Sequence, residues 1–177
     1  MNRGFSIPEL LVVVAIIVLM TGLLLINWRS GERSLALSRV VHKAGQDVRR
    51  VQELALRAQA YICPNAPIIP TETISGYGVF FNQDSPDLYI LFAECNHNNT
   101  YNEGIDGIVE AISLESGITI SSVAPNSKTS IVFVPPTPQV FINGNTDGNM
   151  QVSFQRTDGV GNVKILDVNA KGVIDVD

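Results

Sequence analysis

The chain has 177 residues and a formal net charge of −5, a length that allows one globular domain beside a membrane helix. Its hydrophobic content of 45% and charged content of 16% fit a packed domain and exclude a disordered chain. Seven basic residues stand against three acidic ones at positions 29–59, whereas four stand against thirteen from position 60 onward. The acidic distal part lacks the basic surface that nucleic-acid binding requires, so we expect no nucleic-acid partner.

The N-terminal stretch combines one acidic residue with a long apolar run. Glu9 precedes a run from Leu10 to Ile26 that only one threonine and one glycine interrupt. As a helix this run is about 25 Å long, close to the thickness of a hydrocarbon core once residues 5–8 are added. We therefore predict that residues 5–27 cross a membrane. Because an ionisable group in lipid is costly, Glu9 should have an opposite charge as its partner.

Gly4, Phe5 and Glu9 ahead of this run resemble the N-terminus of type IV prepilins and type II secretion pseudopilins. The resemblance implies a leader of residues 1–4, cleavage between Gly4 and Phe5 by a prepilin peptidase, and methylation of the new amine of Phe5. It also implies that Glu9 acts in assembly by neutralising the amine of a neighbouring subunit. Pro8 fits this cut, because in a helix that starts at Phe5 it lies in the first turn, where its missing N–H costs nothing.

The two alternatives to this processing are a cleaved secretory signal peptide and an uncleaved signal anchor. A secretory signal peptide would need a small-residue cleavage site after the apolar run, and the sequence from Ile26 to Arg29 has none. An uncleaved signal anchor stays open, although it does not explain Glu9. We expect a single-pass protein of the bacterial inner membrane with an extracytoplasmic globular domain, later assembled in a periplasmic or extracellular filament.

From position 28 the sequence becomes amphipathic. Apolar residues recur at spacings of three and four, which predicts a helix with one buried stripe. The other face carries arginines and glutamates, which we interpret as a solvated face or as subunit contacts. We predict one helix from about Ser6 to Gln59, whose second half, residues 28–60, is stopped by Pro64.

Residues 61–177 are interpreted as a β-rich globular domain, with short β-type runs between turn-forming residues. Asn82 to Asp87 predicts a hairpin, and Glu115 to Gly117 a second turn. The expected strands are residues 77–81, 88–92, 108–114, 118–123, 130–134, 140–142, 150–156, 162–168 and 173–176. The sequence therefore predicts an α+β, pilin-like fold: a long N-terminal helix, transmembrane in its first half and amphipathic in its second, packed on an antiparallel β-sheet domain.

The segment from Asp47 to Ala58 is similar to the helical stretch of H-type minor pseudopilins and related minor pilins. The β-rich remainder is similar too, down to a final strand preceded by the turn from Ala170 to Gly172. The resemblance implies a structural subunit, a minor pilin or H-type pseudopilin, of a type IV pilus-like filament or a type II secretion system. Its partners would be other pilin subunits, the prepilin peptidase and an inner-membrane assembly platform. The alternatives are a DNA-uptake minor pilin and a membrane-anchored adhesin or enzyme.

An Asn-rich loop at residues 94–106 is a candidate ligand site. Asn96, Asn98, Glu103 and Asp106 offer oxygen ligands of the kind that calcium takes. The loop lacks the aspartates and the glycine placement of a calcium-binding loop, so a solvated connection between strands is the favoured interpretation. We therefore predict no cofactor, with calcium as the weaker alternative.

The sequence holds no catalytic set. It has no nucleophile elbow, no zinc-protease motif, no phosphate-binding loop with lysine and no zinc spacing, so we expect no enzyme. Cys63 and Cys95 both follow the predicted membrane segment, and a disulfide between them is possible. Two buried free thiols are the alternative.

Overall fold

The computed structural model describes residues 7–63, 74–136, 139–159 and 163–177. One helix, α1, runs from Ile7 to Leu56 and is followed by nine strands. The strands are β1 Gly76–Asn82, β2 Leu88–Glu94, β3 Gly107–Ser113, β4 Ile118–Ala124, β5 Lys128–Val134, β6 Gln139–Ile142, β7 Asn149–Arg156, β8 Lys164–Asn169 and β9 Ile174–Val176. The chain divides into two compact units, Met1–Leu35 and Ala36–Asp177, which are described separately.

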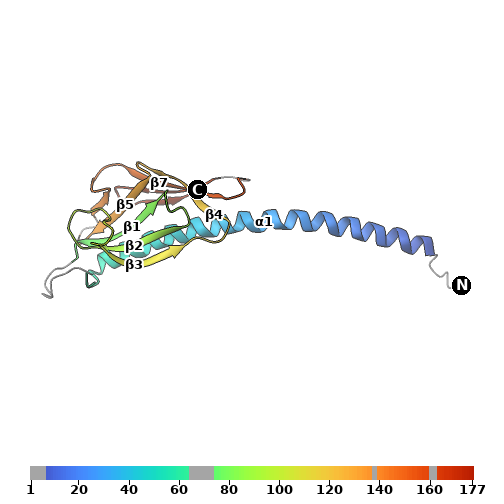
Figure 1. Ribbon diagram of the computed structural model, residues 1–177, viewed down its shortest axis with the longest axis horizontal. Helices are drawn as coiled ribbons and strands as arrows, with labels where there is room; N and C mark the ends of the chain where they lie inside the picture. Colours follow the sequence, from blue (N-terminus) through green and yellow to red (C-terminus); the bar gives the residue numbers. More distant parts are fainter. Residues whose placement is uncertain (1–6, 64–73, 137–138, 160–162) are drawn as a thin grey trace. The chain divides into compact units, whose positions relative to one another are not determined.

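The second unit contains two antiparallel sheets (Figure 1). Sheet A has five strands in the order β3-β2-β1-β5-β6, and sheet B has four in the order β4-β7-β8-β9. Each strand lies within two residues of a predicted one, and the predicted hairpin at 82–87 joins β1 to β2. The predicted turn at 115–117 has a different role, since it carries the chain from sheet A to sheet B.

The predicted fold class was wrong. More residues lie in strands than in helix, and all the strands pair antiparallel in two sheets. The strands form two sheets where one was expected, because β4 leaves its neighbour β3 in sequence and pairs with β7. The transmembrane half of the predicted helix is not supported either, because no helix among the described residues is long and apolar enough to cross a membrane.

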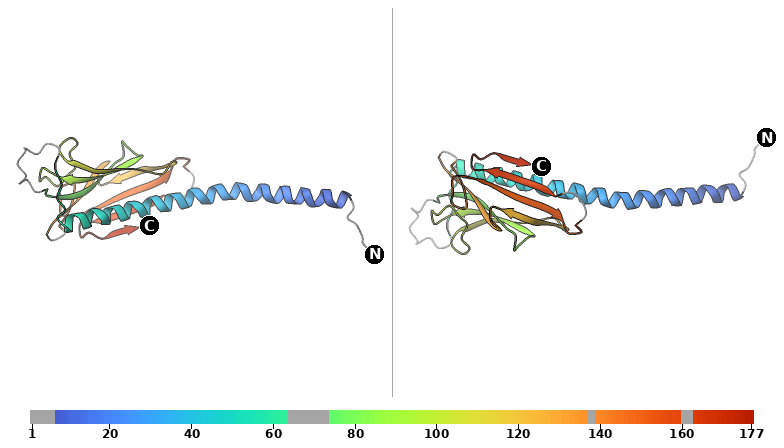
Figure 2. Two further views of the ribbon diagram at one scale, coloured as in Figure 1. Left: turned by 90° about the horizontal axis from the view of Figure 1, so that it is seen from below. Right: turned by 90° about the horizontal axis from the view of Figure 1, so that it is seen from above.

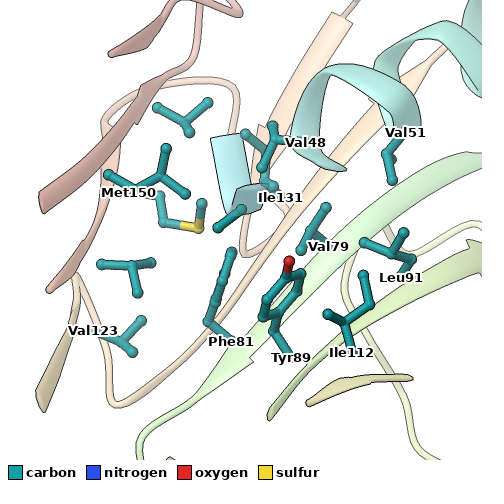
Figure 3. Packing of buried hydrophobic residues seen from close by; sticks show 14 of the residues in the cluster. Val48, Val51, Val79, Phe81, Tyr89, Leu91, Ile112, Val123, Ile131 and Met150 are labelled. Atoms are coloured by element: carbon teal, nitrogen blue, oxygen red, sulfur yellow. The ribbon is translucent and has the colours of Figure 1, made fainter. Parts of the chain in front are cut away.

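The core of the second unit is built on one stripe of α1. Val41, Val48 and Val51 are fully buried, at the helical spacing that the sequence predicted. In Figure 3, Val48 and Val51 face Val79 of sheet A, and Met150 of sheet B lies in the same cluster. The inner faces of both sheets therefore share a single core with the helix.

Gly45 lets sheet B approach α1 closely. A Cβ atom at this position would lie 3.0 Å from Cγ2 of Val176 and 3.6 Å from Cδ1 of Leu166. Two views of the ribbon show β8 and β9 beside the second half of the helix (Figure 2). A glycine inside a helix usually costs about 1 kcal/mol relative to alanine. Here that cost is offset by the close helix–sheet contact.

A buried polar pair joins α1 to sheet A. Asp47 lies on the buried side of the helix and is 8% exposed. The hydroxyl of Tyr89, on β2, donates a hydrogen bond to Oδ2 of Asp47 at 2.5 Å. Burial and the neighbouring carboxylate raise the pKa of Tyr89 far above its ordinary value, so the phenol stays protonated and remains a donor. The pair fixes the register between the helix and β2.

The helix ends earlier than predicted, and proline does not end it. The N–H of Gln59 donates to the carbonyl of Leu54, and the N–H of Ala58 donates to that of Ala55. Ala58 has a φ of 44°, in the left-handed region that commonly closes helices. Backbone capping at Ala58 therefore stops α1 before Pro64 is reached.

We expect Tyr89→Phe to destabilise the protein by about 1–3 kcal/mol, because it removes a donor from a buried carboxylate. Urea unfolding followed by far-UV circular dichroism measures the change. Asp47→Leu combined with Tyr89→Phe should be less destabilising than the sum of the two single changes. Tyr61→Phe is the matched control, since the hydroxyl of Tyr61 bonds an exposed carbonyl. An equal loss in Tyr61→Phe and Tyr89→Phe would contradict the role of the buried pair.

Candidate functional site

The first part of α1 presents apolar side chains on every side. Each described side chain from Ile7 to Leu23 is exposed, with Val13 at 48% and Ile7 at 84%. The apolar residues form a continuous run, so the helix has no polar face that water would solvate well. Exposed apolar surface of this extent marks a site of interaction with another apolar surface.

The predicted membrane anchor is not supported. In the part of the chain that the structure describes, no stretch of helix is both long enough and apolar enough to cross a membrane. The predictions of a transmembrane segment at 5–27 and of a single-pass inner-membrane location were therefore wrong.

The predicted processing residues fall at the start of this helix. Gly4 and Phe5 lie outside the described residues. Glu9 lies in the first turn of α1, where a negative charge interacts favourably with the helix dipole. Further along, the hydroxyl of Thr21 donates to the carbonyl of Ile17 at 2.7 Å, so the backbone stays helical through this polar position.

The polar loop at 94–106 is organised by two buried carboxylates. Glu94 is 0% exposed and accepts hydrogen bonds from the N–H groups of Asn96 and Asn99, at 3.0 and 3.3 Å. Asp106 is 2% exposed and accepts from the N–H groups of Cys95 and Asn102, at 2.9 and 2.6 Å. Burial raises the pKa of Asp106, and these two N–H bonds partly counteract the rise. At both ends of the loop, these carboxylates thus accept the backbone N–H groups that the carbonyls of a neighbouring strand would accept in a sheet.

The calcium candidates are engaged with one another. The side-chain amides of Asn96 and Asn98 both donate to Oδ1 of Asn102, whose own N–H binds Asp106. The fourth candidate, Glu103, is exposed. Within the described ranges, no group of three His, Cys, Asp or Glu side chains is placed to hold a metal ion. The oxygens of this loop serve its own hydrogen-bond network.

The same loop covers the outer face of sheet A. The ring of Tyr101 lies 4.5 Å from that of Phe80 and 5.0 Å from that of Phe92, measured between centroids. Phe92 is fully buried although it points away from the main core. The loop is therefore a connection between β2 and β3 that is exposed at residues 97–98 and 103–105 and is anchored on the sheet by the ring of Tyr101.

A disulfide ties the segment after α1 to the start of this loop. Cys63 and Cys95 are bonded, with their Cα atoms 6.0 Å apart. The sequence had left a disulfide and two free thiols open, and the structure contains the disulfide. The hydroxyl of Tyr61 also donates to the carbonyl of Ile108, and that of Tyr77 to the carbonyl of Gln59. Three links thus hold residues 59–63 against sheet A.

Two ion pairs join the flank of α1 to β3 and to the turn that follows it. Arg39 binds both carboxylate oxygens of Glu115, at 2.9 and 3.2 Å, and Arg50 binds Glu110 at 2.7 Å. The Arg39 guanidinium lowers the pKa of Glu115. All four side chains stay well exposed, so solvent screening leaves these pairs little weight in stability. The predicted solvated face of arginines is therefore partly engaged within the chain.

Sequence reasoning missed the buried polar residues. Asp47 and Glu94 were not singled out as buried residues, although the three-four spacing of the helix places Asp47 on the core-facing stripe. A polar residue at a core-facing helical position was the available signal for Asp47, because a buried carboxylate needs donors nearby. The sequence alone gave no such signal for Glu94, because its donors are backbone groups of a loop.

Comparisons of the chain with protein-family models, with curated proteins and with solved structures find no match. The functional argument therefore depends on the chain's own residues and their arrangement.

Replacing both cysteines, Cys63→Ser with Cys95→Ser, should lower the free energy of unfolding by about 3–4 kcal/mol, because the bond restricts a long loop in the unfolded chain. Denaturant unfolding under oxidising conditions measures the loss. Reduced wild type serves as the control and should match the double variant. A variant as stable as the oxidised wild type would show that the disulfide contributes nothing to the fold.

Proposed function

We propose that this protein is a structural subunit of a helical filament that assembles through the apolar first part of α1. The observation that carries the proposal is the exposure of every described side chain from Ile7 to Leu23. Identical apolar helices packed side by side would bury one another's surface, at roughly 25 cal/mol for each Å² removed from water. The proposal thus gives a partner to the one large apolar surface of the first unit.

The second unit has a hydrophobic core of its own, which supports the proposal that assembly proceeds through the first unit. Residues 36–177 bury their own helix stripe and close a disulfide, so they can fold before any assembly. The first unit has no comparable cluster of buried residues among its described side chains. A subunit of this kind would enter the filament with its globular domain already folded, and it would attach through the exposed first part of α1.

The N-terminal motif narrows the class of filament. Gly4, Phe5 and Glu9 resemble the processing site of type IV prepilins and type II secretion pseudopilins, and a minor pilin or H-type pseudopilin is the form we propose. Prepilin peptidase would cut after Gly4 and the amine of Phe5 would be methylated. Glu9 would then pair with the amine of a neighbouring copy, because a carboxylate in an apolar bundle needs an opposite charge. Other subunits and an assembly platform would be its partners, and it would catalyse no reaction.

Leu19→Arg tests whether the exposed apolar side chains of residues 7–23 form the assembly surface. We expect the concentration of full-length chain at which filaments form to rise by about tenfold or more, since an unpaired charge in an apolar interface costs more than the 1.4 kcal/mol that a tenfold change represents. Sedimentation and negative-stain electron microscopy follow assembly. Ile62→Arg is the matched control: Ile62 is 91% exposed in the second unit, and its replacement should have no effect. Equal assembly of Leu19→Arg and wild type would refute the proposed surface.

The processing site has an independent test. Coexpression with a prepilin peptidase should yield a chain that begins at a methylated Phe5, observed by mass spectrometry of the intact protein. Gly4→Leu should block the cut and leave Met1 in place. Finding an intact Met1 in the wild-type chain, while a known prepilin is cut in the same cells, would rule out the prepilin interpretation.

A further inference from the structure

The outward side of α1 in the second unit is basic. Lys43 and Arg49 are exposed on the part of the helix that turns away from the core. Among the described residues, Arg49 forms no ion pair, and Lys43 contributes only a longer-range attraction to Glu115. We name Lys43 and Arg49 the basic helix face. Among the described residues no ion pair neutralises Arg49, so its guanidinium is available to a partner of opposite charge.

The outer face of sheet B has the opposite character. Burial alternates along β7, with Met150, Val152 and Phe154 turned inward, so the residues between them face outward. Residues paired directly across neighbouring strands face the same side of the sheet, so the registers of β7 with β8 and of β8 with β9 identify the outward-facing residues of all three strands. The polar ones include Asn149, Gln151, Ser153, Asp167, Asn169 and Asp175. We name this surface the acidic sheet face. It contains two carboxylates and no lysine or arginine among these residues.

The two carboxylates of this face lie directly opposite each other. Asp167 on β8 pairs in register with Asp175 on β9. Like charges at directly opposed positions destabilise a sheet. Amides from Gln151 and Asn149 donate to Asp167 at 3.0 and 3.4 Å, and Asp175 accepts from the N–H of Val176. These neutral donors soften the repulsion but bring no positive charge to the pair.

We propose that the acidic sheet face of one copy docks on the basic helix face of a second copy. The inference rests on the proposed function, because it places a second contact beside the apolar helix contact within the same filament. The two faces have complementary charges: Asp167 and Asp175 gain a cation, which none of the outward-facing residues named above supplies, and Arg49 gains a carboxylate. An arginine–carboxylate contact is often bidentate, which also fixes orientation.

The geometry of this contact suits a filament. The two faces are different surfaces of the same chain, so the contact is heterologous and leaves one face free at each end. Such contacts repeat into open helical assemblies unless a ring closes. A single exposed ion pair is weak, yet repetition along the filament adds its effect at every subunit. The contact should weaken as salt rises, because exposed charges are screened.

A charge exchange tests the contact in the full-length chain. Arg49→Glu and Asp175→Lys, each alone, should raise the concentration at which assembly begins by about fivefold in low salt, equivalent to roughly 1 kcal/mol per contact. The double variant carries a reversed but complementary pair and should assemble nearly as wild type does. The effect of each single change should shrink in high salt. Glu103→Lys, an equal charge change on the exposed polar loop, is the control and should leave assembly unchanged.

The outcomes separate this contact from the proposed function. Assembly that requires Leu19 but ignores Arg49→Glu and Asp175→Lys would overturn the docking contact alone. Failure of the double variant to recover would also overturn it. Assembly that ignores Arg49→Glu yet depends on added calcium would assign the acidic sheet face to a metal and overturn the contact. A wild-type chain that stays monomeric would overturn the contact and the filament together.

Discussion

The burial of one helix stripe against two sheets is the constraint on which the rest of the second unit depends. Val41, Val48 and Val51 are fully buried, and Gly45 brings sheet B to within contact of the same helix. The Tyr89–Asp47 pair then fixes sheet A in register with the stripe. A helix that packs on two sheets along one side must keep its opposite side polar. Arg49, which forms no ion pair among the described residues, lies on that polar side.

The polar loop at 94–106 covers the face of sheet A that is turned away from the main core, and the disulfide joins the start of this loop to Cys63. Phe92 points away from the main core and needs a partner, which Tyr101 supplies. Glu94 and Asp106 hold the loop in place by accepting backbone N–H groups where no strand partner exists. Backbone donors buried without acceptors would cost free energy, so these carboxylates stabilise the loop while remaining buried themselves.

The first unit contrasts with this self-contained packing. Its described apolar side chains from Ile7 to Leu23 are exposed, and no helix among the described residues is long and apolar enough to cross a membrane. The proposed contact with other copies would cover these side chains, since helices in a bundle bury each other's apolar surface. The surplus of positive charge on α1 and of negative charge in the β-rich part would give the copies of the proposed filament a preferred orientation.

The sequence by itself determined the local elements. Alternation and turn residues located each strand to within two residues, and the three-four spacing identified the buried stripe, because both patterns arise from the geometry of the backbone. Pairing between distant segments was decided only by the tertiary structure: the split into two sheets, the Asp47–Tyr89 bond and the engagement of Asn96, Asn98 and Asp106 with Asn102. The composition of residues 5–27 suggested a membrane span, whereas no helix among the described residues is long and apolar enough to cross a membrane. Local patterns carry periodicity, whereas the choice of partner depends on which surfaces the whole chain brings together.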